Sequence, residues 1–267
     1  MAIESEVALL DAAHEALDGD NAQECLSLLA RLPVPGLEAR ALEIVAWLDL
    51  GELERAAVAH REGVLLFGAH EDEAFLFAEA EYFFHSWQIE SAIEALGRSL
   101  AIERGPVSLT QLAACHDVLE DYAAADSALE EAHALAPDEF CTPARMTIDQ
   151  CDAVVGKAMD ELDESYRKAL ENTQIVIEPM PFADLAKDDP MAVPPDTLGL
   201  FVGPTLEESA EDHGAELPPV IFIFQRNIER GCATQEELRR EIRITLYHEI
   251  GHRLGLDEHE VDALGLG

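Results

Sequence analysis

Residues 245–259 read Thr245-Leu-Tyr-His248-Glu249-Ile-Gly-His252-Arg-Leu-Gly255-Leu-Asp257-Glu258-His259. The pattern is HExxHxxGxxE, and its two histidines are four residues apart. On a helix, this spacing places both imidazoles on one side, one turn apart, where they can bind a single zinc ion. Glu249 lies between them in the chain, as expected of a carboxylate that takes a proton from a metal-bound water without being a ligand. The pattern predicts a zinc site on a helix.

The residues before this motif have the pattern of an amphipathic helix. Thr234 and Glu237 have the spacing of a capping box. Apolar residues then recur at every fourth position, at Leu238, Ile242, Leu246 and Ile250. We therefore expect a helix over residues 235–253, with the histidines on a flank of its apolar stripe. The alternative is that His248 and His252 are two surface histidines of an amphipathic helix.

A zinc site that keeps one position open for water needs a third protein ligand. Because fifteen residues follow His252, we expect this ligand in the tail. Gly255 can adopt the left-handed conformation that ends a helix and turns the chain back toward the metal. Three candidates then follow one another, Asp257, Glu258 and His259.

Four segments together resemble the minimal zincins, the matrix-metalloprotease-like domain of bacterial metallopeptidase family proteins. The segments are Leu198–Gly203, Pro218–Arg230, Glu237–His252 and Gly255–Glu258. The resemblance covers about residues 146–266. It implies a small α+β fold, bound Zn²⁺ and hydrolysis of peptide bonds.

The resemblance also implies a role for each residue of the motif. His248, His252 and Glu258 are expected to bind the metal, and Glu249 is expected to be the catalytic general base. The family typically has aspartate at the position of Glu258, so the longer carboxylate departs from its pattern. His259 and, after it, Asp257 stay alternatives for the third ligand.

The composition bounds the class of protein. The chain has 267 residues, 48% hydrophobic and 27% charged, which suits a soluble globular protein with two modest domains or one large one. Its net charge of −38 argues against nucleic acid and anionic membranes as partners, and it allows basic peptides as substrates. Residues 1–6 are acidic where a secretory signal is basic, and no apolar run approaches the roughly 20 residues of a membrane span. We therefore expect a cytoplasmic location.

The N-terminal half has the composition of helices separated by short turns. Small residues follow four of these turns at steps of 31, 36 and 33 residues, and they are Cys25, Ala56, Ala92 and Ala125. These steps bracket the period of about 34 residues that is typical of tetratricopeptide repeats. We expect an all-α tetratricopeptide-like solenoid over residues 1–141, which is suited to bind a protein partner or recruit substrate. The alternative is a helical domain that only stabilises or oligomerises the enzyme.

The pattern changes near residue 140 and predicts a second, α+β domain over residues 142–267. A helix is expected from Pro143 to about Glu171. Residues 179–197 hold five prolines and are expected to be a long irregular loop. Strands are expected at residues 174–178, 197–202 and 220–224.

The last two of these strands are candidates to bind an extended substrate by strand addition. The unbroken apolar run at 220–224 instead favours a central, buried strand. The polar residues after it either orient substrate or pair with nearby glutamates. These polar residues are Arg226, Asn227 and Arg230, and the glutamates are Glu236 and Glu237.

Two functions are consistent with these patterns. The first is a zinc-dependent metallopeptidase whose helical repeats recruit a peptide or protein substrate, or a protein partner. The second is a tetratricopeptide adaptor whose zincin module binds zinc without cutting. The presence of Glu249 beside both histidines favours the enzyme, because a module that only binds zinc needs no general base.

Overall fold

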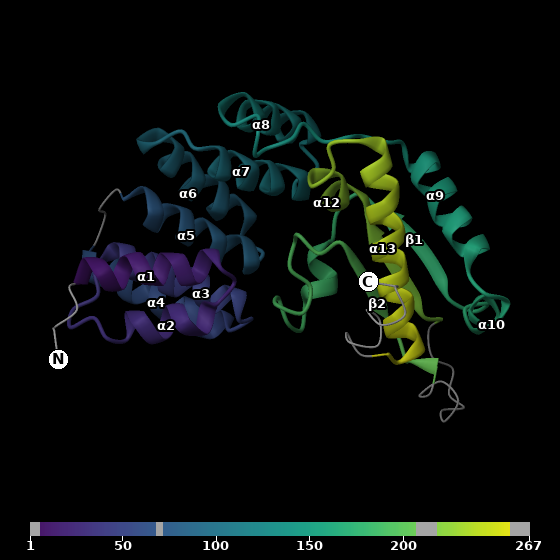
Figure 1. Cartoon of the computed structure of the whole chain (residues 1–267), viewed down its shortest axis with the longest axis horizontal. Helices are drawn as coiled ribbons and strands as arrows, with labels where there is room; N and C mark the ends of the chain where they lie inside the picture. Colours follow the sequence, from purple (N-terminus) through teal and green to yellow (C-terminus); the bar gives the residue numbers. More distant parts are fainter. Residues whose placement is uncertain (1–5, 68–71, 207–217, 257–267) are drawn as a thin grey trace. The chain divides into compact units, whose positions relative to one another are not determined.

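The computed structural model describes residues 6–67, 72–206 and 218–256 (Figure 1). The chain divides into two compact units. Unit 1 comprises residues 1–140 and 182–195, and unit 2 comprises residues 141–181 and 196–267. Within the described ranges, no helix is both long enough and apolar enough to cross a membrane.

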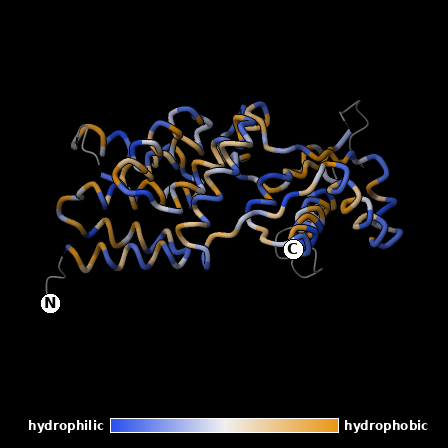
Figure 2. Tube along the Cα trace, turned by 90° about the horizontal axis from the view of Figure 1, so that it is seen from above, coloured by the Kyte–Doolittle hydropathy of each residue, from blue (hydrophilic) through white to orange (hydrophobic). Residues whose placement is uncertain are grey.

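Unit 1 is built from helices that pack as consecutive antiparallel pairs (Figure 1). The pairs are α1 (Glu6–Asp18) with α2 (Ala22–Leu29), α3 (Leu37–Asp49) with α4 (Leu53–Phe67), α5 (Glu73–His85) with α6 (Ile89–Ile102), and α7 (Pro106–Val118) with α8 (Tyr122–Leu135). Polar and apolar residues alternate along these helices (Figure 2). Helices with such a pattern can bury one side against their neighbours. Helix α5 is the exception, since it packs against α3, α4 and α6 and Ala74 is its one exposed residue.

The four pairs share the same turn. A residue with positive φ ends each turn, and these residues are Asp20, Gly51, Trp87 and Glu120. Five residues later comes a small residue with 0% exposure, namely Cys25, Ala56, Ala92 and Ala125. The small side chains predicted to let paired helices approach closely are therefore fully buried. The identity of these pairs as tetratricopeptide repeats stays a prediction.

The proline-rich segment expected at 179–197 contains a short 3₁₀ helix, η1 (Ala183–Ala186). Its residues 182–195 belong to unit 1. The indole Nε1 of Trp87 donates a hydrogen bond to the Val193 carbonyl at 3.1 Å, and the Val193 side chain is buried. This segment therefore packs on the helical unit, although it lies within the sequence of the second expected domain.

Unit 2 contains a three-stranded sheet in the order β1-β3-β2. The strands are β1 (Gln174–Glu178), β2 (Gly199–Val202) and β3 (Val220–Phe224). β3 runs parallel to β1 and antiparallel to β2. The expectation of a central, buried β3 is confirmed, since Ile221 and Ile223 have 0% exposure. β2 begins two residues later than expected, and the Thr197 carbonyl before it accepts a hydrogen bond from the Asn227 side chain at 2.8 Å.

The prediction of one helix over residues 143–171 is wrong in two respects. The helix starts later, and two helices are found in place of one. Instead, α9 (Ile148–Glu161) begins after a capping box, in which Thr147 Oγ1 accepts from the Gln150 N–H at 3.2 Å. Leu162 then adopts an extended conformation, and α10 (Glu164–Ala169) follows as a separate helix. Thr147 caps the helix more effectively than the Thr142-Pro143 pair, because its side chain satisfies an N–H of the first turn.

The core of unit 2 lies between the sheet and its two longest helices, α9 and α13 (Gln235–Leu254). The apolar stripe expected on α13 is confirmed, since all four of its residues have 0% exposure. These residues pack with Ile221 and Ile223 of β3 and with Cys151 and Val155 of α9. The core therefore fixes which side of α13 faces the sheet, and hence where the histidines stand.

Candidate metal centre

Local signals set both ends of α13. At its start, Thr234 Oγ1 accepts from the Glu237 N–H at 3.2 Å, and Glu237 Oε2 accepts from the Thr234 N–H at 3.0 Å. At its end, Gly255 has a φ of 79°, and the Leu256 N–H donates to the Gly251 carbonyl at 3.0 Å. The capping box and the left-handed glycine are therefore confirmed. They leave the histidines in the last two turns of the helix, just before the chain reverses.

His248 and His252 converge as their spacing predicts. Their Nε2 atoms are 3.0 Å apart, and both side chains are half-buried. A tetrahedral zinc ion with Zn–N distances near 2.05 Å separates its nitrogen ligands by about 3.4 Å, close to this arrangement. Neutral imidazole nitrogens are common zinc ligands, so this pair fits a zinc ion in both chemistry and spacing.

Glu249 stands on the neighbouring, buried side of the same helical turn. Its side chain is 6% exposed. A Cβ atom added to Gly199 of β2 would lie 2.9 Å from both Cγ and Oε1 of Glu249, and 2.7 Å from Cγ2 of Thr245. Strand β2 therefore lies directly against the turn of α13 that carries the proposed base, at a distance that only glycine allows.

Sequence reasoning did not single out Gly199 as a contact of Glu249. A lone glycine inside a strand often marks the close approach of another segment, so a signal was present. The signal does not name the approaching segment, which here lies fifty residues further along the chain.

We expect Gly199→Ala to destabilise unit 2 by about 1–3 kcal/mol, because the new methyl group overlaps Glu249 and Thr245. Urea unfolding followed by circular dichroism measures this change. Gly156→Ala is the matched control, because Gly156 lies inside α9 with nothing within 4 Å of an added Cβ. It should stabilise the protein by about 0.5–1 kcal/mol. Equal stability of the Gly199→Ala and parent proteins would contradict the close approach of β2.

Arg253 holds the end of α13 in place and was not recognised from the sequence. Its side chain is buried, and burial lowers the pKa of its guanidinium. Nη1 donates to the Pro204 carbonyl at 2.5 Å, and Nε donates to Thr173 Oγ1 at 3.4 Å. The residue after His252 is therefore tied to segments that adjoin β2 and β1.

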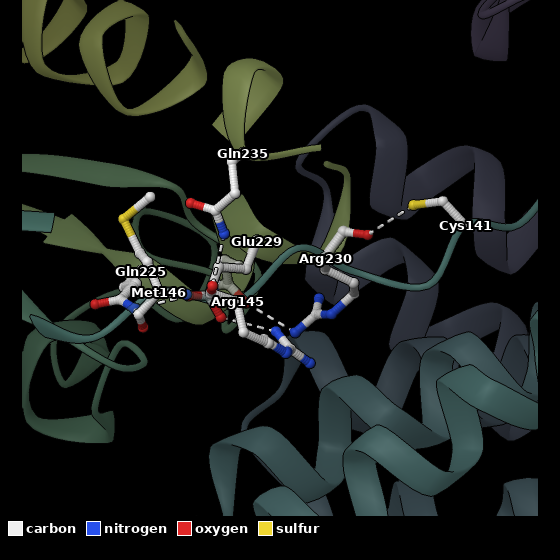
Figure 3. Close-up of polar contacts among 8 residues, drawn as sticks. Cys141, Arg145, Met146, Gln225, Glu229, Arg230 and Gln235 are labelled. Carbon is white, nitrogen blue, oxygen red and sulfur yellow. Dashed lines mark hydrogen bonds and ion pairs between the residues drawn. The ribbon is translucent and has the colours of Figure 1, made fainter. Parts of the chain in front are cut away.

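A second buried polar cluster positions the start of α13 (Figure 3). The carboxylate of Glu229, on α12 (Gln225–Arg230), accepts from Arg145 Nη1 at 2.9 Å, the Met146 N–H at 3.0 Å and Gln225 Nε2 at 2.6 Å. Gln235, in the first turn of α13, donates to the Arg145 carbonyl at 2.7 Å. One buried carboxylate thus joins α12, the segment before α9 and, through Arg145, the N-terminus of α13.

The polar residues after β3 have structural partners. Arg230 Nη2 donates to Asn227 Oδ1 at 2.9 Å, and Asn227 Nδ2 donates to the Thr197 carbonyl at 2.8 Å. Arg226 donates its backbone N–H to the Pro179 carbonyl at 2.9 Å. Glu237 is the third helical residue of the capping box of α13, in which its carboxylate accepts from the Thr234 N–H. Asn227 therefore helps to hold the residues that lead into β2.

The candidates for the third metal ligand, Asp257, Glu258 and His259, lie outside the described residues. Among the residues that are described, no group of three or more His, Cys, Asp or Glu side chains is placed to hold a metal. The structure thus brings two expected ligands together, His248 and His252, with the expected base beside them. The assignment of the third stays a prediction.

Comparison with known proteins finds one family for the C-terminal part of the chain. No curated protein matches the sequence. Residues 170–267 match the family described as zincin-like metallopeptidase. The match starts after α9, later than the start near residue 146 expected from the resemblance, and it includes the whole sheet and α13. The C-terminal residues 170–267 are thus similar in sequence to zincin-like metallopeptidases.

Proposed function

We propose that this protein is a zinc-dependent metallopeptidase in which His248, His252 and Glu258 bind the metal and Glu249 is the general base. One observation carries the proposal: two histidine Nε2 atoms converge to 3.0 Å on the helix that also places Glu249 beside strand β2. The family match to residues 170–267 supports the same type of domain.

Different residues of the chain have different roles in the proposed hydrolysis. Zinc, when bound, lowers the pKa of its water and polarises the substrate carbonyl. His248 and His252 supply neutral imidazole nitrogens from one side of α13. Glu249 accepts a proton from the attacking water on its carboxylate and passes it to the leaving amine. Gly199 leaves the space in which this carboxylate sits.

Strand β2 is the proposed binding site for an extended peptide substrate. Within the described sheet it is an outer strand with β3 as its neighbour, whereas β3 is buried between two strands. Its first residue, Gly199, lies against Glu249. A peptide that pairs with the outer edge of β2 would therefore run past the proposed base. The helical pairs of unit 1 are proposed to recruit the substrate or a protein partner.

Digestion of a peptide library by the full chain tests the proposed function. A library made from denatured protein, basic sequences included, is incubated with the zinc-loaded protein, and new peptide termini are identified by mass spectrometry. We expect cleavage that a zinc chelator such as 1,10-phenanthroline prevents. A protein that binds zinc at His248 and His252 but generates no new termini would instead be a non-cleaving, zinc-binding adaptor.

Glu258→Ala and His259→Ala proteins identify the third ligand. We expect Glu258→Ala to weaken zinc binding well beyond the roughly 10- to 100-fold that follows loss of a residue that only supports a ligand. His259→Ala should bind zinc nearly as tightly as the parent. Competition with a chromophoric chelator in identical buffer measures both affinities. Tight binding by Glu258→Ala together with loss in His259→Ala would reverse the assignment.

A further inference from the structure

An open groove of about 740 Å³ lies along α9 and α13 in unit 2. Its residues recur three or four positions apart on each helix, so each helix contributes one continuous stripe. From α9 come Gln150, Ala153, Val154, Lys157, Ala158 and Glu161, from α13 come Glu236, Arg239, Arg240 and Arg243, and Met146 precedes α9. The groove is therefore lined by one face of each of the two helices.

The sign of its charge sets this groove apart from the rest of the protein. The chain has 17 Lys and Arg residues and a net charge of −38. Four of these cations line the groove, against two carboxylates, so its own balance is positive. The four are Lys157, Arg239, Arg240 and Arg243. The excess of positive charge in the groove can pair with the carboxylates of an acidic partner.

The cations are only partly neutralised by their neighbours. Lys157 Nζ and Arg243 Nη1 lie 3.7 Å and 3.6 Å from the same carboxylate, that of Glu161. Arg239 Nη1 donates to the Gln235 carbonyl, which carries no net charge. These three side chains and Arg240 are exposed, so they can turn toward a bound ligand without loss of core packing.

Small and apolar side chains of α9 also line the groove. They are Ala153, which is exposed, Val154, which is half-buried, and Ala158, which is buried. Tyr247 reaches across from α13 and donates its hydroxyl to the Ala158 carbonyl at 3.0 Å. Short side chains leave room for the apolar ridge of another helix, and the surrounding cations favour acidic residues beside that ridge.

The groove is separate from the candidate metal centre on the same helix. The groove residues of α13 end at Arg243. His248 follows five residues later, which places it about 140° around the helix, and His252 lies about 180° around it. A ligand in the groove therefore leaves the face with the histidines open.

We propose that this groove binds an acidic amphipathic helix of a partner protein. The apolar ridge of that helix lies over Ala153 and Val154, and its Asp and Glu residues pair with the basic side chains of α9 and α13. From Gln150 to Glu161 the groove spans about 17 Å, the length of three helical turns. A nucleic acid fits less well, because its backbone has no apolar ridge to lie over Ala153 and Val154. This inference does not depend on the proposed peptidase activity.

Peptide binding to the full chain tests the proposal. The probe is a fluorescent 14-residue peptide with Leu recurring three and four positions apart, four Glu residues beside this ridge and Ala elsewhere, a composition that favours an amphipathic helix. A scrambled peptide of the same composition, without the apolar ridge, is its control. Anisotropy should show a Kd below about 100 μM for the probe and at least tenfold weaker binding of the scrambled peptide. Equal binding of the two peptides, or none up to about 1 mM, would overturn the proposal.

Two pairs of variants locate the binding. The double variant Arg239→Glu/Arg240→Glu should weaken peptide binding at least tenfold. Its control is Arg31→Glu/Arg61→Glu, which changes the net charge by the same amount at exposed residues of unit 1 and should leave peptide binding unchanged. Ala153→Trp fills the groove without altering charge and should also weaken binding at least tenfold. Ala101→Trp, at an exposed site on α6, should not. Equal losses in the control variants, or displacement of the probe from the groove by a single-stranded oligonucleotide of equal charge, would refute an acidic-helix site.

Discussion

Glu249→Gln is expected to lower the rate of peptide hydrolysis by about 10²- to 10⁴-fold while zinc content stays at the parent level. Glutamine has the same shape as glutamate, so the contact with Gly199 is preserved, but its amide does not accept the proton of the attacking water. Zinc stays because Glu249 is not a proposed ligand. Initial rates on a fluorogenic peptide derived from the library digest, with zinc measured on the same samples, give both quantities.

The matched control for this variant is Glu241→Gln, a half-buried glutamate on the same helix, outside both the motif and the groove. It makes the same chemical change and should hydrolyse the peptide at the parent rate. If Glu249→Gln cleaves as fast as the parent, Glu249 is not the base. If it also loses its zinc, the loss of rate no longer reports on proton transfer.

The second large effect is expected at Glu229, whose side chain is 2% exposed. Glu229→Ala should lower the free energy of unfolding by about 3 kcal/mol. The change leaves the Arg145 guanidinium, the Met146 N–H and the Gln225 amide without their shared acceptor. The expected value lies at the low end of the usual range for broken buried pairs, because water still reaches part of Arg145.

Urea unfolding measures this loss, with Glu131→Ala as the control. Glu131 also accepts hydrogen bonds from an arginine, Arg104, but this pair is exposed. Water replaces its bonds, so the midpoint of unfolding should stay close to that of the parent. Coincident unfolding curves for Glu229→Ala and the parent protein would show that the cluster in Figure 3 does not stabilise unit 2.

The parts of the fold that the sequence predicts well are those set by neighbouring residues. The helix expected over 235–253 is observed over Gln235–Leu254. Its capping box, the successive residues of its apolar stripe and its terminal glycine each depend on residues no more than about one turn away. The three strands are found where apolar runs indicate them. The convergence of His248 and His252 likewise follows from helix geometry alone.

Features set by distant residues were not predicted. Glu229 meets Arg145, 84 positions away, and Trp87 donates to the Val193 carbonyl, 106 positions away. No periodic pattern encodes such pairs, because each partner by itself resembles an ordinary polar or proline-rich segment. The approach of Gly199 to Glu249 belongs to the same class.

The N-terminal unit shows the limit of a periodic signal. The recurring turn with positive φ and the buried small residue five positions later confirm that the spacing of these residues reflects close helix packing. The spacing does not distinguish one type of helical repeat from another, nor does it name a ligand. A role in recruiting substrate therefore stays a proposal that depends on binding experiments.

The zinc content of the 267-residue chain tests the central claim most directly. We expect about one zinc ion per chain in protein purified without added metal, and almost none in the His248→Ala/His252→Ala protein. A His14→Ala/His116→Ala protein, which loses two histidines of the helical unit, should keep its zinc. Parent protein that stays free of zinc after incubation with the metal, or equal zinc in the parent and His248→Ala/His252→Ala proteins, would contradict the account.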